Sequence, residues 1–264
     1  MPGILLGDVF PNFEAETTIG KIKFHDFLGN SLILLSSRWG ILFSHPRDFT
    51  PVCTTELACA AKISNEFKKR NVKMIALSID SVADHLAWSK VCLPFSLHPL
   101  PMWFKCREHI PVHCITTIWT ASLKQDVMAF NSDGADSPLP FPIIADDKRE
   151  LSVQLGMLDP DELDKDGIPL TARCVFVIGP DKKMKLSILY PATTGRNFDE
   201  LLRAIDSLQL TALKKVATPV DWKPGEKCMV IPSLSDAEAA ELFPNGVTTK
   251  ELPSGKKYLR YTQP

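Results

Sequence analysis

A lone cysteine follows two prolines in the stretch HPRDFTPVCTTE, residues 45–56. Its spacing to the next cysteine, Cys59, is C-x5-C, which is neither a C-x-x-C redox pair nor a paired zinc knuckle. Residues 53–70 have the pattern of a helix, so Cys53 would lie in the first turn, where unpaired backbone N–H groups and the helix dipole stabilise an anion. A thiolate there would be a nucleophile, whereas the structural alternative is a small buried hydrophobe.

The neighbours of this cysteine favour the reactive interpretation. Pro51 holds Thr50 in an extended conformation, so the Thr50 side chain can project beside the sulfur instead of joining the helix. Cys53 also shares a helical face with Leu57 and Phe67, which would shelter a thiolate from bulk water. We therefore favour a reactive thiol over a structural one.

Composition places the chain among ordinary globular proteins. It has 264 residues, 45% hydrophobic and 23% charged, enough for one large domain or one domain plus a smaller appendage. A formal net charge of -1 argues against bulk affinity for nucleic acid or anionic membranes. The N-terminus lacks the basic region of a signal peptide, and no apolar stretch approaches the length of a membrane span. Seven cysteines without framework spacing predict a reducing, cytosolic compartment.

Strand and helix patterns alternate along most of the chain, which predicts a mostly parallel sheet covered on both faces. The expected strands are 39–45, 72–80, 141–146, 173–179 and 185–191, and the expected helices are 53–70, 81–90, 148–157 and 197–210. The tail, 217–264, is rich in proline and glycine. It predicts a small second unit with one helix at 236–243 and a hairpin through 252–261.

Pro46, Thr50 and Cys53, in the frame SHPRDFTPVCTTEL, resemble the active-site signature of the peroxiredoxins. The surrounding chain closely resembles the 1-Cys class of that family. Supporting stretches are RNVKMIALSIDSVADHLAWSK, LPFPII, TARCVFVIGPDKKMKLSILYPATTGRNFDE, TPVDWK and FPNGVTTKELPSGKKYLRYT. The resemblance covers nearly the whole chain except 32–38 and 91–125, so it is far more specific than a motif match.

This resemblance implies an α/β, thioredoxin-like domain over 5–210 and a small C-terminal α+β arm domain over 211–264, in a homodimer. It implies reduction of hydroperoxides, including phospholipid hydroperoxides, without a bound cofactor or metal. Glutathione would be the reducing co-substrate, delivered with help from a pi-class glutathione transferase. The family also implies a cytoplasmic location with a lysosomal fraction, and peripheral contact with phospholipid membranes.

The resemblance also assigns roles to individual residues. Cys53 would be the peroxidatic nucleophile, whose thiolate attacks the distal peroxide oxygen and becomes a sulfenic acid. Thr50 and the backbone N–H of Cys53 would bind the peroxide oxygens. Arg173 would place its guanidinium beside the thiolate and stabilise the developing negative charge. Pro46 belongs to the signature, and His45 matches a histidine near the mouth of the site.

Other cysteines are poorly placed to resolve an oxidised Cys53. Cys59 is six positions further along the helix and would point to its opposite side. Cys174 alternates with Arg173 along a strand, so it would face away from the pocket that Arg173 serves. Cys228 lies in the tail and cannot be placed. These positions agree with a 1-Cys mechanism.

The resemblance carries a second activity, a calcium-independent phospholipase A(2) with a serine, histidine and aspartate set. By position these are Ser31, His25 and Asp181. The G-x-S-x-G motif is broken here, because the chain reads GNSLILLSSRWG and only deletion of 32–38 would restore GNSWG. The acyltransferase motif of the family, H-x4-D, ends in Asn30 and lacks its carboxylate. We therefore expect weak or no phospholipase activity.

The segment 91–125 departs from the family in composition. It holds three of the seven cysteines and three of the six histidines, and its excision joins AWSK to DVMAFN, as the family has it. We interpret it as a splice variant or a gene-model artefact. A metal site is the rival interpretation, but no paired spacing supports tetrahedral zinc. Its ligands would come from Cys92, His98, Cys106, His109, His113 and Cys114.

Two further classes of function compete with the peroxidase. One is a lipid hydrolase or phospholipid-remodelling protein of the membrane surface, which the split lipase motif disfavours. The other is a non-enzymic redox sensor, which would need an accessible second thiol and a slow reaction with peroxide. A thioredoxin-type disulfide reductase is disfavoured because the C-x-x-C motif is absent.

Overall fold

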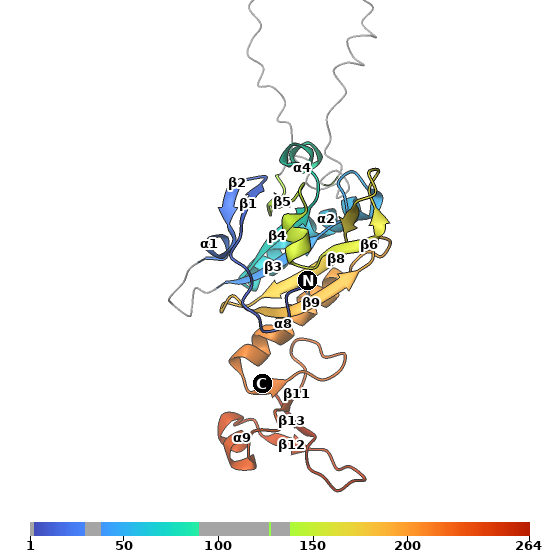
Figure 1. The fold of residues 1–264 in the computed structure, drawn as a ribbon. Coiled ribbons are helices and arrows are strands. Elements are labelled where there is room, and N and C mark those ends of the chain that lie inside the picture. Colours follow the sequence, from blue (N-terminus) through green and yellow to red (C-terminus); the bar gives the residue numbers. More distant parts are fainter. Residues whose placement is uncertain (1–2, 30–37, 90–126, 128–137) are drawn as a thin grey trace, which may run out of the picture. The chain divides into compact units, whose positions relative to one another are not determined.

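The structure of the chain is a computed structural model, shown in Figure 1, and it describes residues 3–29, 38–89, 127 and 138–264. The chain divides into two compact units, Met1–Arg196 and Asn197–Pro264. The sequence prediction placed the boundary between residues 210 and 211, whereas the contacts assign the long helix that starts at residue 198 to the second unit. No helix among the described residues is both long and apolar enough to span a membrane.

Seven strands form the main sheet of the first unit, in the order β2-β1-β5-β4-β3-β8-β9. Their bounds are β1 Glu14–Thr17, β2 Gly20–Lys23, β3 Trp39–Ser44, β4 Val72–Ser78, β5 Ile143–Ala145, β8 Arg173–Ile178 and β9 Met184–Tyr190. Among the described strands of this sheet, only the β3–β4 and β4–β5 pairs are parallel, so the prediction of a mostly parallel sheet is wrong. A short turn between β8 and β9 forces these strands into an antiparallel hairpin, and β8 also runs antiparallel to β3.

The helices of the first unit differ from the prediction mainly in their ends. They are α1 Phe24–Leu28, α2 Pro51–Lys62, α3 Ser64–Lys69, α4 Val82–Ser89 and α7 Glu150–Gln154, and a small ladder pairs β6 Leu158–Leu163 with β7 Pro169–Thr171. The helix expected over 53–70 is two helices, because Ile63 adopts φ -95 and ψ 9 between them. The helix expected over 148–157 is reduced to α7.

The parallel strands β3, β4 and β5 end at one edge of the sheet, and this edge carries the candidate site. Every residue of β3 and β8 is buried, so side chains on both faces of these central strands lie in the interior. The loop 45–50 leaves the end of β3 and leads directly into α2. Figure 1 shows β3, β4, β8 and β9 side by side.

The second unit is α+β, as predicted. It consists of α8 Phe198–Leu213, β10 Val216–Ala217, β11 Cys228–Val230, α9 Asp236–Leu242, β12 Val247–Thr249 and β13 Arg260–Thr262. Its strands form a sheet in the order β10-β11-β13-β12, and its core includes Trp222, Val230 and Phe243. The predicted hairpin is present, with β12 and β13 paired on either side of the connecting segment. Ser235 and Glu238 form a capping box that starts α9.

Candidate active site

Cys53 is the third residue of α2 and its side chain is fully buried. Pro51 occupies the first helical position, where its missing N–H costs nothing, so the helix begins two residues earlier than predicted. Thr50 is extended, with φ -117 and ψ 149, and its hydroxyl does not cap the helix. That hydroxyl donates to the carbonyl oxygen of Arg47 at 2.9 Å. The N–H groups of the first turn therefore remain available beside the sulfur.

Arg173, the first residue of β8, is directed at the sulfur. Its Nη1 donates to Cys53 Sγ at 3.3 Å. Its Nε and Nη2 both donate to the carbonyl oxygen of Ala192, at 2.9 Å and 2.6 Å, which fixes the plane of the guanidinium. The Arg173 side chain is buried, so its charge acts on Cys53 with little screening by water. The structure thus brings together Cys53 and Arg173, as predicted.

Glu56 extends this pair into a buried network that sequence reasoning missed. It lies three residues after Cys53, on the same face of α2. Arg173 Nη1 donates to Glu56 Oε2 at 2.6 Å, and Arg196 donates through Nη2 to Oε2 and through Nε to Oε1, both at 2.9 Å. A glutamate on the buried face of a helix requires a cationic partner, and that was the available sequence signal.

Arg196 ties the network to the sheet. Its Nη1 donates to the carbonyl oxygens of Ser44 and Cys174, at 2.9 Å and 3.0 Å, and its guanidinium lies over the ring of Phe43. Burial alone raises the pKa of Glu56, but the Arg196 and Arg173 charges and the hydrogen bonds from Arg196 outweigh it and leave the pKa below its ordinary value. Glu56 therefore stays ionised and holds both arginines in place.

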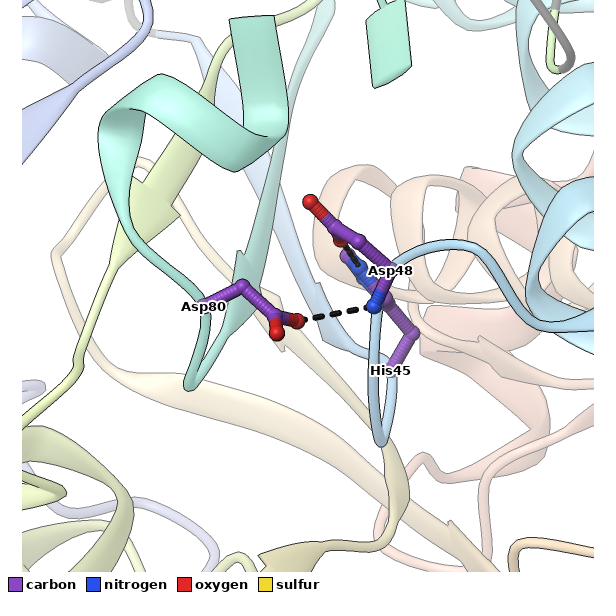
Figure 2. A group of neighbouring side chains, drawn as sticks. All are labelled: His45, Asp48 and Asp80. Carbon is purple, nitrogen blue, oxygen red and sulfur yellow. Dashed lines mark hydrogen bonds and ion pairs between the residues drawn. The ribbon is translucent and has the colours of Figure 1, made fainter. Parts of the chain in front are cut away.

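His45, which the resemblance placed near the mouth of the site, is fully buried. Its Nε2 lies 2.7 Å from Asp48 Oδ1, as Figure 2 shows, and its carbonyl oxygen accepts a bond from the Thr171 hydroxyl at 2.7 Å. Burial raises the pKa of Asp48, but hydrogen bonds from His45 and His85 more than offset this and leave the pKa below its ordinary value. Pro46, also buried, continues the chain into the loop.

The other described cysteines are placed as the 1-Cys prediction requires. Cys59 is exposed, on the opposite side of α2 from the buried Cys53, and none of the described cysteines forms a disulfide. Cys174 lies in the core, where burial raises the pKa of its thiol to about 11. Burial also raises the pKa of Cys228, in the second unit. Burial therefore disfavours the reactive thiolate form of Cys174 and Cys228, and Cys59 points away from Cys53.

The proposed lipase partners have other contacts. His25 Nε2 lies 2.7 Å from the carbonyl oxygen of Phe10. Asp181 accepts a bond from Lys185 Nζ at 2.6 Å and another from the N–H of Lys183. Burial raises the pKa of Asp181, but the bond from Lys185 and the other hydrogen bonds lower the pKa by more than burial raises it. The pKa of Asp181 therefore lies below its ordinary value. The polar ends of both side chains therefore already have partners.

The structure describes only part of the lipase motif. Ser31 and Asn30 lie outside the described residues. Trp39 and Gly40, which the prediction regarded as displaced parts of the motif, belong to β3. A Cβ at Gly40 would lie 2.5 Å from Leu28 Cδ2, so this glycine permits close packing of α1 on the sheet. Its role in the structure is packing and not a nucleophile turn.

Two other sequence hypotheses also fall outside the described residues. The segment 91–125 and residues 32–37 are not described, so their origin as a splice variant or gene-model artefact stays a prediction. The zinc-site alternative stays untested for the same reason. Its six residues are Cys92, His98, Cys106, His109, His113 and Cys114.

Comparison with known protein families identifies the class of protein to which the chain belongs. Residues 6–98 match the AhpC/TSA family, and residues 207–246 match the C-terminal domain of 1-Cys peroxiredoxin. The fold and the helix-terminal cysteine with its arginine define a thiol peroxidase of the peroxiredoxin type. The chain belongs to the peroxiredoxin family, in its 1-Cys class.

The relatives are similar over their full lengths. Peroxiredoxin-6 of Gallus gallus is 64% identical over 262 residues, with 99% of this chain and 98% of the relative covered. Peroxiredoxin-6 of Homo sapiens is 61% identical over 263 residues, with 99% of each covered. A crystal structure of a cysteine-to-serine mutant of peroxiredoxin 6 of Arenicola marina matches with a TM-score of 0.79 and 54% identity, over 99% of this chain and 98% of that one. A yeast mitochondrial 1-Cys peroxiredoxin matches with a TM-score of 0.73 and 37% identity, over 99% and 100%.

Proposed function

We propose that this peroxidase reduces hydroperoxides through Cys53, with Thr50 and Arg173 binding the peroxide oxygens. The observation that carries the assignment is the 3.3 Å contact between Arg173 Nη1 and a buried sulfur in the first turn of a helix. Both the guanidinium and the helix terminus favour negative charge at that place. Among the described cysteines, Cys53 alone combines these features.

The reaction balances as a two-electron transfer. The Cys53 thiolate attacks the terminal oxygen of ROOH, the S–O bond forms as the O–O bond breaks, and the cysteine becomes a sulfenic acid. The leaving alkoxide takes a proton from solvent and departs as ROH. The Arg173 guanidinium and the N–H groups of the first turn stabilise the charge that passes to the leaving oxygen.

We propose glutathione as the reductant, in keeping with the absence of a suitable resolving cysteine among the described residues. One glutathione would displace the hydroxyl of the sulfenic acid as water, and a second would release the Cys53 thiol and form oxidised glutathione. The yeast relative is described as resolving its thiol through glutathione and thioredoxin systems. A pi-class glutathione transferase would help to deliver glutathione to the buried sulfur.

We also propose a homodimer that uses the outer edge of β9. Among the described strands β9 ends the main sheet; its first residue, Met184, pairs with Gly7 and Asp8, but Leu189 near its far end is 57% exposed and offers an apolar surface at a sheet edge. Sedimentation of the wild type and of a Leu189→Glu variant tests this surface. A dimeric variant would contradict it.

Phospholipid hydroperoxides, peripheral membrane contact and a cytoplasmic location with a lysosomal fraction are proposals that rest on the family resemblance. Lipid-vesicle flotation and cell fractionation test them. Phospholipase activity is not favoured, because His25 and Asp181 have other partners in the structure.

Stopped-flow measurement of peroxide consumption tests the central assignment. The wild type should react rapidly and the Cys53→Ser variant should not react at all. A slow reaction that passes oxidation to a bound partner would instead favour the redox sensor. Equal rates in the wild type and the variant would contradict the role of Cys53.

A further inference from the structure

The loop 45–50 carries Thr50 and sets the start of α2, yet its conformation is held from outside the loop. Phe49 has φ 55, in the left-handed region that costs a non-glycine residue free energy, and its side chain is 56% exposed. Such a conformation persists only where the surroundings enforce it. The N–H of Asp48 donates to Asp80 Oδ2 at 2.7 Å, which anchors the loop to the segment after β4 (Figure 2).

The Asp48 carboxylate makes one bond within the loop and one to a residue outside it. Oδ1 lies 2.7 Å from His45 Nε2, and Oδ2 lies 2.6 Å from Nδ1 of His85. His85 belongs to α4, is fully buried, and places its Nε2 3.2 Å from the carbonyl oxygen of Ile144 in β5. The loop that leads to Cys53 is therefore tied to α4 through His85, and through the other ring nitrogen of His85 to β5.

The partners determine where the protons lie. The Ile144 carbonyl can only accept, so His85 Nε2 carries a proton. Each oxygen of Asp48 faces a histidine nitrogen, and a carboxylate accepts both bonds, so His85 Nδ1 donates as well. The lowered pKa of Asp48 agrees with this arrangement. His85 is then an imidazolium. His45 donates through Nε2, and its buried Nδ1 has no partner among the described residues.

Nearby charges agree with this assignment. Oxygens of Asp48 and Asp80 and a ring nitrogen of His45 all lie within 4.8 Å of one another, and a cation nearby stabilises two carboxylates at such a distance. His85 supplies it on the buried side, and Arg47 lies 4.0 Å from Asp80 on the exposed side. A metal is the alternative cation. However, His45 Nε2 is already directed at Asp48, and Asp80 Oδ2 already accepts bonds from the Ser78 hydroxyl and the Asp48 N–H.

We propose that Asp48 and His85 form a buried ion pair that positions the loop 45–50, and with it Thr50 and the first turn of α2, for the reaction at Cys53. Neither residue touches the sulfur, so both are positioning residues. The pair goes beyond the proposed chemistry, because it concerns how the site is held and not which groups bind peroxide. Its loss misplaces Thr50 relative to Cys53, and a misplacement of about 1 Å costs on the order of a hundredfold in rate.

Kinetics on the full chain test the positioning role. Asp48→Ala removes the carboxylate that binds His45 and His85 and should slow oxidation of Cys53 by about tenfold to a hundredfold. Asp48→Asn should recover most of the rate, because its amide can accept from His45 and donate to a neutral His85. Asp147→Ala removes an exposed aspartate that follows β5 and should stay within twofold of the wild type. A folded Asp48→Ala variant with the wild-type rate, or an Asp48→Asn variant as slow as Asp48→Ala, would overturn the proposal.

Nitrogen-15 NMR of labelled histidine tests the charge independently of turnover. At pH 7 the signals lost in a His85→Gln variant should show both ring nitrogens protonated, and they should become those of a neutral ring in Asp48→Asn. A neutral His85 in the wild type would overturn the ion pair, even if the peroxidase assay succeeds. Loss of peroxidase activity on treatment with EDTA, with recovery on addition of Zn²⁺, would overturn it in favour of a metal. If Asp48→Ala does not fold, the pair His85→Ala and His85→Gln provides the same kinetic comparison.

Discussion

Two candidate sites lie at opposite ends of β3: the peroxidatic edge, where β3 ends, and the lipase edge, where β3 begins. The residues of the two sites are arranged differently. At the end of β3, Cys53, Arg173 and Glu56 form one connected and buried network. At the start of β3, His25 and Asp181 each bind a different neighbour, and neither is buried. The residue types of a motif can therefore be present without being assembled, because chemistry requires their polar atoms to converge.

The strand between these edges limits how far the segment 32–38 disturbs the fold. Its described pairings run without a break, from Trp39 opposite Val72 to Ser44 opposite Leu77. Its register with β4 is regular over all six pairs. A disturbance at the start of β3 is thus separated from Cys53 by the full length of a buried strand.

Cys53→Ser gives the largest expected effect at the peroxidatic edge, a complete loss of peroxide reduction. The matched control is Cys59→Ser, which replaces an exposed thiol on the other side of the same helix and should keep most of the rate. Stopped-flow consumption of peroxide measures both. A comparable loss in the control would refute the 1-Cys mechanism.

Arg173→Lys should slow oxidation of Cys53 by about a hundredfold, the typical cost of removing one preorganised donor. Lysine keeps the charge, but it cannot bind Cys53, Glu56 and the Ala192 carbonyl together as the guanidinium does. The second-order rate constant with hydrogen peroxide is the measurement. A loss of less than threefold would show that charge alone suffices.

Glu56→Gln should destabilise the fold at neutral pH by about 3 kcal/mol, because two buried arginines lose their shared counter-charge. The folded pKa of Glu56 lies below the ordinary 4.5, so its contribution is present above that value and is lost as pH falls through the folded pKa. The difference between wild type and variant should therefore shrink below about pH 4.5. Urea unfolding across pH 3 to 7 measures it, and a difference independent of pH would contradict the ionised network.

The lipase edge should respond to deletion rather than substitution. The full chain should hydrolyse phospholipid weakly or not at all, and deletion of 32–38 should restore activity by rebuilding GNSWG around Ser31. Ser31→Ala in the deletion background is the control and should abolish the gain. Full hydrolysis by the unmodified chain would show that the serine or its turn is misplaced in our account.

The smallest expected effect is on peroxide reduction when the lipase edge is altered. His25→Gln and Asp181→Asn should leave the peroxide rate within about twofold, because surface changes remote from a site usually have small effects. A loss of tenfold or more in either variant would show that the two edges are coupled.

The sequence predicted the peroxidatic edge well where the relevant information is local. The helix pattern and Pro51 place Cys53 in a first turn, and the family resemblance pointed to Arg173. Glu56 and Arg196 were missed, because a buried ion pair joins residues far apart in the chain, and only the fold shows which charges face inward.

The wrong strand direction and the unforeseen burial of His45 have the same physical origin. Alternating strands and helices suggested parallel pairing, but the hairpin of β8 and β9 reverses the direction next to β3. His45 follows a buried strand, yet its own burial depends on Asp48 and on His85, which is 37 residues from Asp48. Neither fact is encoded in local sequence periodicity.

Trapping the oxidised cysteine tests the central claim most directly. The full chain would be treated with one equivalent of hydrogen peroxide in the presence of dimedone, which labels sulfenic acids, and its tryptic peptides would be analysed by mass spectrometry. Our account predicts the label on Cys53 alone, with no intramolecular disulfide. A label mainly on Cys59 or Cys174, or a disulfide between Cys53 and another cysteine of the chain, would contradict it.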